Sequence, residues 1–158
     1  MDIVDCILAD HDRQRRWFAA LDEARDDLES AGKIFNRLRD HLEAHAMAEE
    51  KYFYPTLLQL GKCALDSDSA DETTEDAIDD HNKIANAADA ALNEEVGSDA
   101  WWKCVDKANY QNSAHLSEEE RQGLTDFRRR VPLEKRIALG IKYLAFEADH
   151  VTNVEREE

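Results

Sequence analysis

The sequence predicts an all-α fold, an up-down-up-down four-helix bundle with an additional C-terminal helix. Apolar residues recur at three- and four-residue steps over long stretches, strand signals are almost absent, and the 158 residues include only five glycines and two prolines. Short connections between long amphipathic helices make consecutive helices antiparallel. We therefore expect one domain over residues 1–158, with the bundle over about residues 2–130 and the additional helix over about residues 133–155.

The first two helices are predicted from apolar stripes that end at glycines. From residue 2 to about residue 30 apolar side chains recur at helical spacing, and Gly32 provides a stop. A second stripe begins at Ile34 and predicts a helix that ends at Gly61. Residues 62–71 are rich in serine and aspartate and break the periodicity, so the longest loop is expected there.

Three more helices follow in the second half of the chain. The third carries the apolar residues of the segment 78–92, and Ser98 is placed to cap the next helix. That fourth helix is expected over about residues 99–130. It ends before Pro132, which fits the first position of a fifth helix over about residues 133–154.

Composition excludes several classes of function. Lysine and arginine total 20 against 36 aspartates and glutamates, and a net charge of −16 repels nucleic acids and anionic membranes. No run of about 18 apolar residues is present, and the N-terminus lacks a basic signal-peptide region, so the expected location is the cytoplasm. The three cysteines have no metal-site spacing and are expected to be free thiols.

The six histidines carry the most informative pattern. His11 and His45 are 34 residues apart, and so are His81 and His115. The second histidine of each pair is followed four residues later by a glutamate, so a polar set occurs twice with an offset of 70 residues. Neighbouring acidic residues repeat with the same offset, Asp10 with Asp80 and Glu50 with Glu120. The candidate metal ligands are the doubled set His11, His45, Glu49, His81, His115 and Glu119.

These residue types in this spacing point to a dinuclear metal site. Residues four apart lie about 6 Å apart on one helix face, and each histidine falls on an apolar stripe, so the side chains face the bundle interior. If Glu49 and Glu119 bridge two ions with an oxo or hydroxo bridge, each octahedral ion keeps one open position. Imidazole and carboxylate ligands suit iron or manganese, with zinc and copper as substitutes in vitro. Dioxygen, peroxide and nitric oxide are the natural small ligands.

The residues resemble the hemerythrin-like (HHE cation-binding) domains over roughly residues 5–145. The specific part is the paired His-x-x-x-Glu motif, the first copy of which runs into Tyr52-Phe53-Tyr54-Pro55. The resemblance implies a four-helix bundle, a non-haem di-iron centre and the six ligands named above. Oxygen-carrying hemerythrins use five histidines, two of them adjacent on one helix, whereas the third helix here has His81 alone. The sequence is therefore more similar to intracellular bacterial members, for which iron or oxygen sensing, peroxide breakdown and nitric oxide reactions are known.

Several polar residues remain outside the repeat. His41 is expected near the ligands or facing solvent, with metal ligation as its alternative. His150 is expected on the surface, with capping of the bundle mouth as its alternative. Tyr54 is expected to pack near a helix end, with a hydrogen bond to a ligand as its alternative. Asp10 and Asp80 are expected to be solvated caps, with acceptance of a hydrogen bond from an imidazole N–H as their alternative.

Three functions are compatible with this sequence. The leading hypothesis is a di-iron protein that binds or reacts with dioxygen, hydrogen peroxide or nitric oxide. The second is an iron- or oxygen-responsive binding module without turnover, and the third is an oxygenase acting on an organic substrate.

Overall fold

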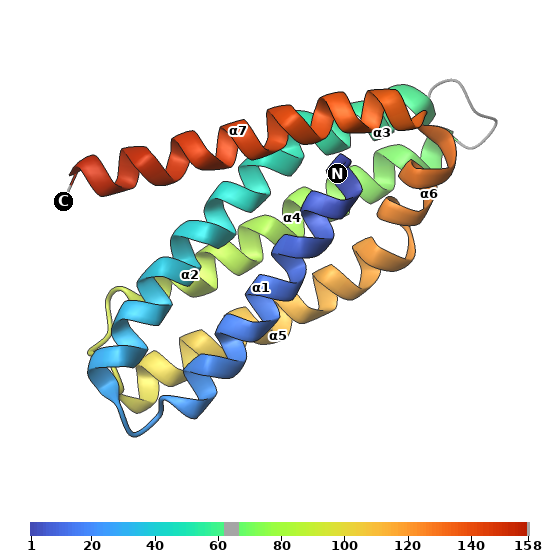
Figure 1. The fold of residues 1–158 in the computed structure, drawn as a ribbon. Coiled ribbons are helices and arrows are strands. Elements are labelled where there is room, and N and C mark those ends of the chain that lie inside the picture. Colours follow the sequence, from blue (N-terminus) through green and yellow to red (C-terminus); the bar gives the residue numbers. More distant parts are fainter. Residues whose placement is uncertain (62–66, 158) are drawn as a thin grey trace.

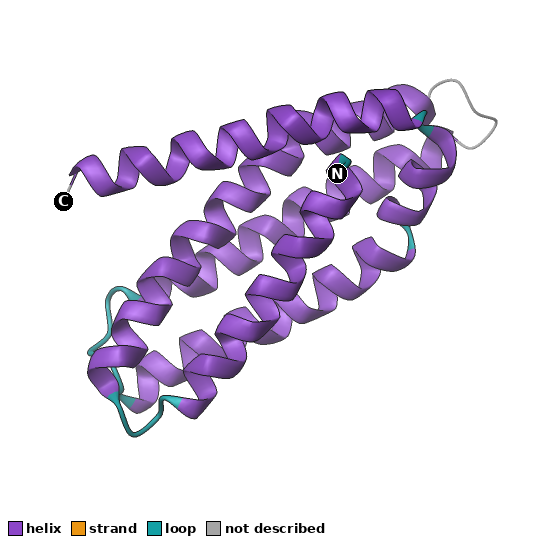
Figure 2. Cartoon of the chain, in the orientation of Figure 1, coloured by secondary structure: helices purple, strands orange, loops and turns teal. Residues whose placement is uncertain are grey.

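The computed structural model describes residues 1–61 and 67–157, and every element within these ranges is helical (Figure 2). No helix among the described residues has the length and apolar character needed to cross a membrane. Cys63 lies outside the described residues, whereas Cys6 and Cys104 are free thiols as expected. The elements are α1 (Ile3–Glu23), α2 (Leu28–Ala48), the π-helical turn η1 (Glu49–Phe53), α3 (Tyr54–Gly61), α4 (Ser67–Ala91), α5 (Asp99–Arg121), α6 (Gly123–Arg130) and α7 (Leu133–Glu157).

Helices α1, α2, α4 and α5 lie side by side along one direction, and α7 crosses α1 and α2 near the N-terminus (Figure 1). The all-α helical bundle with an additional C-terminal helix is therefore confirmed. Two apolar clusters fill the bundle, one around Ile7 and Phe53 and the other around Phe18 and Trp101. On α1, His11 lies between the residues of these two clusters, so the predicted ligands occupy a polar layer between two apolar regions.

The turn between α1 and α2 differs from the expected position. The stop at Gly32 is wrong, because α1 ends at Glu23 and α2 already begins at Leu28. Asp27 caps α2, with its carboxylate accepting hydrogen bonds from the Ser30 backbone N–H and hydroxyl. This cap stabilises the start of a second helix within a stretch where apolar periodicity alone indicates one continuous helix.

The second predicted helix contains a π-helical turn next to the first His-x-x-x-Glu motif. At the end of η1 the Tyr54 N–H bonds to the Glu49 carbonyl, five residues earlier. Pro55 follows immediately, has no N–H to donate, and its ring crowds the preceding turn. The wider turn accommodates this proline, and η1 contains Glu49 itself.

The remaining helix boundaries also differ in part from the predicted ones. α4 begins at Ser67, so the expected loop over residues 62–71 is helical from Ser67, and residues 62–66 lie outside the described residues. Ser98 caps α5 as predicted and accepts a hydrogen bond from the Trp101 N–H. The single fourth helix is wrong, because α5 ends at Arg121 and α6 begins at Gly123. Glycine is a weak helix former, which favours this break.

Helix α7 packs closely against the start of α1. Asp2 caps α1 by accepting hydrogen bonds from the N–H groups of Val4 and Asp5. The guanidinium of Arg136 on α7 lies 2.8 Å from the Asp2 carboxylate. Gly140 faces the same backbone, where a Cβ would lie only 2.9 Å from the Ile3 nitrogen. The approach of the two helices therefore depends on the absence of a side chain at Gly140.

Candidate metal centre

The structure brings all six candidate ligands into one buried space. Their exposed fractions lie between 0% and 7%, and they come from four different segments of the bundle. α1 supplies His11, and α2 with η1 supplies His45 and Glu49. The second copy of the motif comes from two helices, His81 from α4 and His115 with Glu119 from α5.

The first group of ligand atoms gathers around His11. Its Nε2 lies 3.1 Å from Oε2 of Glu119 and 3.9 Å from Oε1 of Glu49. The same Glu49 oxygen lies 3.1 Å from Nε2 of His45. One ligand atom from each of these four residues lies within 4.8 Å of the others, a separation that one cation can span.

The second group contains His81 and His115 and shares Glu49 with the first. The Nε2 atoms of the two histidines lie 3.1 Å apart, and Nε2 of His81 lies 3.2 Å from Oε2 of Glu49. The two Glu49 oxygens thus face different groups of imidazoles, which is the arrangement expected of a bridging carboxylate. The second oxygen of Glu119 accepts a hydrogen bond from Tyr54.

The buried polar atoms at this centre fit a metal ion. Five atoms facing the space make no hydrogen bond to any described residue, namely Nε2 of His11 and His45, both Glu49 oxygens and Oε2 of Glu119. Leaving buried polar atoms unpaired is costly, and a buried carboxylate costs more than a neutral group. Cations bound between these atoms satisfy them all at once, and imidazole with carboxylate is the donor set of iron, manganese and zinc.

A carboxylate lies next to the second ring nitrogen of every candidate histidine ligand. Because a carboxylate only accepts, it favours a proton on Nδ1 and leaves the Nε2 lone pair free to bind a metal. These partners repeat with the same 70-residue offset as the ligands, a signal that was present in the sequence. The distances from Nδ1 are 2.9 Å for His11 to Glu120, 2.9 Å for His81 to Glu50, 3.3 Å for His45 to Asp10 and 3.6 Å for His115 to Asp80.

The expectation that Asp10 and Asp80 are solvated caps is wrong. Asp10 is 3% exposed, and Asp80 is half-buried. A residue next to a ligand in a helix is rotated by about 100° around the axis, which here directs it toward the adjacent helix instead of solvent. Each aspartate therefore reaches the histidine of the neighbouring helix.

Two tyrosine hydroxyls complete the surroundings of the ligands. Tyr54 donates a hydrogen bond of 2.5 Å to Glu119, so the alternative role considered for it is the one observed. Tyr143 on α7 donates to Asp10 at 2.8 Å and lies 2.7 Å from Nδ1 of His45. No motif in the sequence indicated Tyr143, because its role depends on where α7 docks.

Burial and neighbouring charged groups shift the pKa values of the side chains within the centre. Burial alone lowers the pKa of His81, but the neighbouring carboxylates of Glu49 and Glu50 outweigh burial and raise this pKa to about 10. Burial holds the pKa of His115 below its usual value, although the nearby carboxylate of Glu119 acts to raise it. Burial acts to raise the pKa of Glu119, but the neighbouring His11 and His115 outweigh burial and lower this pKa. Without a metal, protons on imidazoles thus supply the positive charge.

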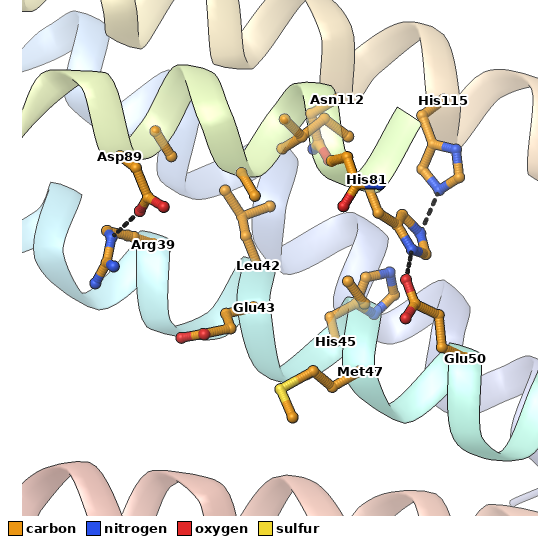
Figure 3. A pocket seen from close by; sticks show the side chains of 15 residues that line it. Arg39, Leu42, Glu43, His45, Met47, Glu50, His81, Asp89, Asn112 and His115 are labelled. Carbon is orange, nitrogen blue, oxygen red and sulfur yellow. Dashed lines mark hydrogen bonds and ion pairs between the residues drawn. The ribbon is translucent and has the colours of Figure 1, made fainter. Parts of the chain in front are cut away.

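A pocket between α2 and α4 leads to the centre. It has a volume of about 210 Å³, and His45, His81 and His115 form its inner end (Figure 3). Its walls are largely apolar, and Arg39 and Asp89 form an ion pair of 2.8 Å beside it. A second cavity of about 270 Å³, with more polar walls, reaches His115 and Glu119 between α4 and α5.

The two remaining histidines lie outside the group of six. His41 is 8% exposed, so it lies near the ligands and does not face solvent. Its ring packs against Trp17 and stacks on the ring of His45. His150 is half-buried on α7, with Nε2 3.9 Å from Glu43, and is therefore less exposed than expected.

Comparison with known proteins agrees with this geometry. The family model described as Hemerythrin HHE cation binding domain matches residues 2–127, which include all six candidate ligands and exclude α7. Neither the curated proteins nor the solved structures contain a significant match. The match covers most of the chain, and the buried histidine and glutamate groups are able to hold metal. The chain belongs to the hemerythrin HHE cation-binding domain family.

Proposed function

We propose that this protein holds two iron ions and reacts there with a small oxidant, namely dioxygen, hydrogen peroxide or nitric oxide. The observation that carries the proposal is the position of Glu49, whose two unpaired oxygens face two different groups of imidazoles. The proposed ligands are His11, His45, Glu49, His81, His115 and Glu119. Manganese or zinc would fit the same donors as substitutes.

The chain prepares the site for metal before any ion binds. The outer carboxylates orient the imidazoles, and Tyr54 holds one oxygen of Glu119. Bound iron supplies electrons and an open coordination position. The two apolar clusters on either side of the ligand layer restrict water to the pockets that reach it.

The dimensions of the apolar pocket support a small, uncharged reactant. Its volume of about 210 Å³ is below the roughly 300 to 1,000 Å³ typical of sites for drug-sized ligands. Leu42 and Ile84 line it, which favours neutral molecules over charged ones. This size favours dioxygen, peroxide or nitric oxide over the organic substrate of an oxygenase.

The test is metal content followed by reaction. We expect anaerobic reconstitution of the purified protein with ferrous iron to leave two irons per chain after desalting. Mixing with dioxygen, hydrogen peroxide or nitric oxide should then change the absorption spectrum. Glu119→Gln removes one ligand charge and should lower the iron content, whereas Glu118→Gln, on an exposed neighbour, should retain it.

Two results would contradict the proposal. A protein that retains no iron after reconstitution does not use this site for iron. Full iron content without any spectral response to the three oxidants would remove the reactive part of the proposal and favour the binding-module hypothesis.

A further inference from the structure

A third group of potential metal ligands lies outside the six proposed for iron. Asp10 on α1, His41 on α2 and Glu147 on α7 each offer one ligand atom, and these atoms lie within 4.8 Å of one another. Glu147 lies beyond the residues that the family model matches. We infer that these three side chains form a separate site for a single divalent transition-metal ion, which joins α7 to the bundle.

Unpaired buried atoms point into this group. Nε2 of His41 and Oε1 of Glu147 are buried and make no hydrogen bond to any described residue. The His41 side chain is 9% exposed, and its Nε2 lies 3.8 Å from Oδ1 of Asp10, too far for a hydrogen bond. Ligand atoms at about 2.1 Å from one ion are about 3 to 3.4 Å apart, so a small inward shift suffices.

The surrounding side chains hold the group in place for an ion. Tyr143 and His45 both contact Oδ2 of Asp10, which leaves Oδ1 directed toward His41. Arg13 is exposed to solvent, and its guanidinium lies 3.9 Å from this oxygen, beyond hydrogen-bond distance.

The donor types of this group suit a divalent transition metal. One imidazole with two carboxylates is a donor set that fits Zn²⁺, Mn²⁺ or Fe²⁺.

Measuring the zinc content per chain tests this inference directly. The purified protein is incubated with excess Zn²⁺, desalted and analysed for zinc per chain, with helical content checked by circular dichroism. Glu147→Gln and His41→Gln should each bind one zinc ion fewer than the wild type. Asp149→Asn removes a carboxylate from the exposed face of α7 and should bind as much as the wild type. Equal zinc content in the wild type and in folded Glu147→Gln would overturn the inference.

A second measurement reports on α7 itself. Zn²⁺ should slow hydrogen exchange of the α7 backbone around Glu147 in the wild type and in Asp149→Asn, but not in Glu147→Gln. Unchanged exchange in the wild type would contradict the proposed link between α7 and the bundle. The outcome is separate from that of the iron proposal, because Glu119→Gln lowers metal content at the six-ligand centre and leaves these three ligands intact.

Discussion

Single hydroxyl groups control how the ligands of this centre are presented. Tyr54 donates to Glu119, and Tyr143 contacts both Asp10 and His45. Both hydroxyls keep their protons, since burial and nearby carboxylates raise the pKa of each tyrosine well above its usual value. They therefore act as hydrogen-bond partners that orient ligands.

Removing the Tyr54 hydroxyl should weaken metal binding while leaving the fold intact. Tyr54→Phe keeps the ring in its buried position but frees one oxygen of Glu119, and loss of such a partner typically costs about 10- to 100-fold in metal affinity. Competition with a coloured chelator for Zn²⁺ measures this change. Tyr110→Phe, at a side chain that is 79% exposed, serves as the control and should bind normally. Equal affinities in the two variants would contradict the role of Tyr54.

The buried His41 should make the metal-free protein sensitive to mild acid. Burial lowers its pKa from 6.5 to about 4, so between these values the unfolded chain binds a proton that the folded chain does not. Its contribution to stability is therefore present above pH 6.5 and lost as the pH falls toward 4. Urea unfolding of the chelator-treated protein at pH 7 and pH 4.5 should show a loss up to about 3 kcal/mol larger than in His41→Gln. Parallel losses in both proteins would argue against a buried neutral His41.

Among the helices, α7 depends on a close backbone contact. An alanine Cβ at position 140 would lie 2.9 Å from the backbone nitrogen of Ile3, so α1 and α7 must move apart to admit it. The Gly140→Ala variant should lose roughly 1 to 3 kcal/mol of stability by overpacking. Thermal and denaturant unfolding measure this change.

Gly32→Ala provides the matched control within α2. Its Cβ would meet Val96 at 3.5 Å, which is an ordinary contact, and alanine is the better helix former by about 0.5 to 1 kcal/mol. This variant should therefore be slightly more stable than the wild type. Similar destabilisation of both variants would show that the backbone contact at Gly140 is not the cause.

Helix existence was predictable from the sequence, but helix boundaries were less so. Apolar periodicity continues through the turn before Leu28, because side chains on both sides of the turn contact the core. The cap at Asp27 and the proline after Tyr54 are local signals for the turn and for η1. They compete with periodicity, and periodicity alone cannot reveal them.

Across the whole molecule, metal and stability should be coupled. The metal-free bundle contains several buried carboxylate and imidazole atoms without hydrogen bonds, so ions that bind only the folded state stabilise it. Free metal at about 1,000 times its dissociation constant contributes about 4 kcal/mol. Chelator treatment should therefore lower the melting temperature, and ferrous iron or zinc should restore it. An unchanged melting transition would remove the basis for sensing through metal-dependent folding.

The sequence by itself determined the helical architecture and the six candidate ligands. Both are encoded along the chain, the first in the spacing of apolar residues and the second in the offset of 70 residues between two copies of one motif. The tertiary structure alone decided which carboxylate meets which imidazole. His45 meets Asp10 and Tyr143 from segments 35 and 98 residues away, and these contacts depend on helix rotation and on where α7 docks. Such properties arise from packing between helices, which a local pattern does not record.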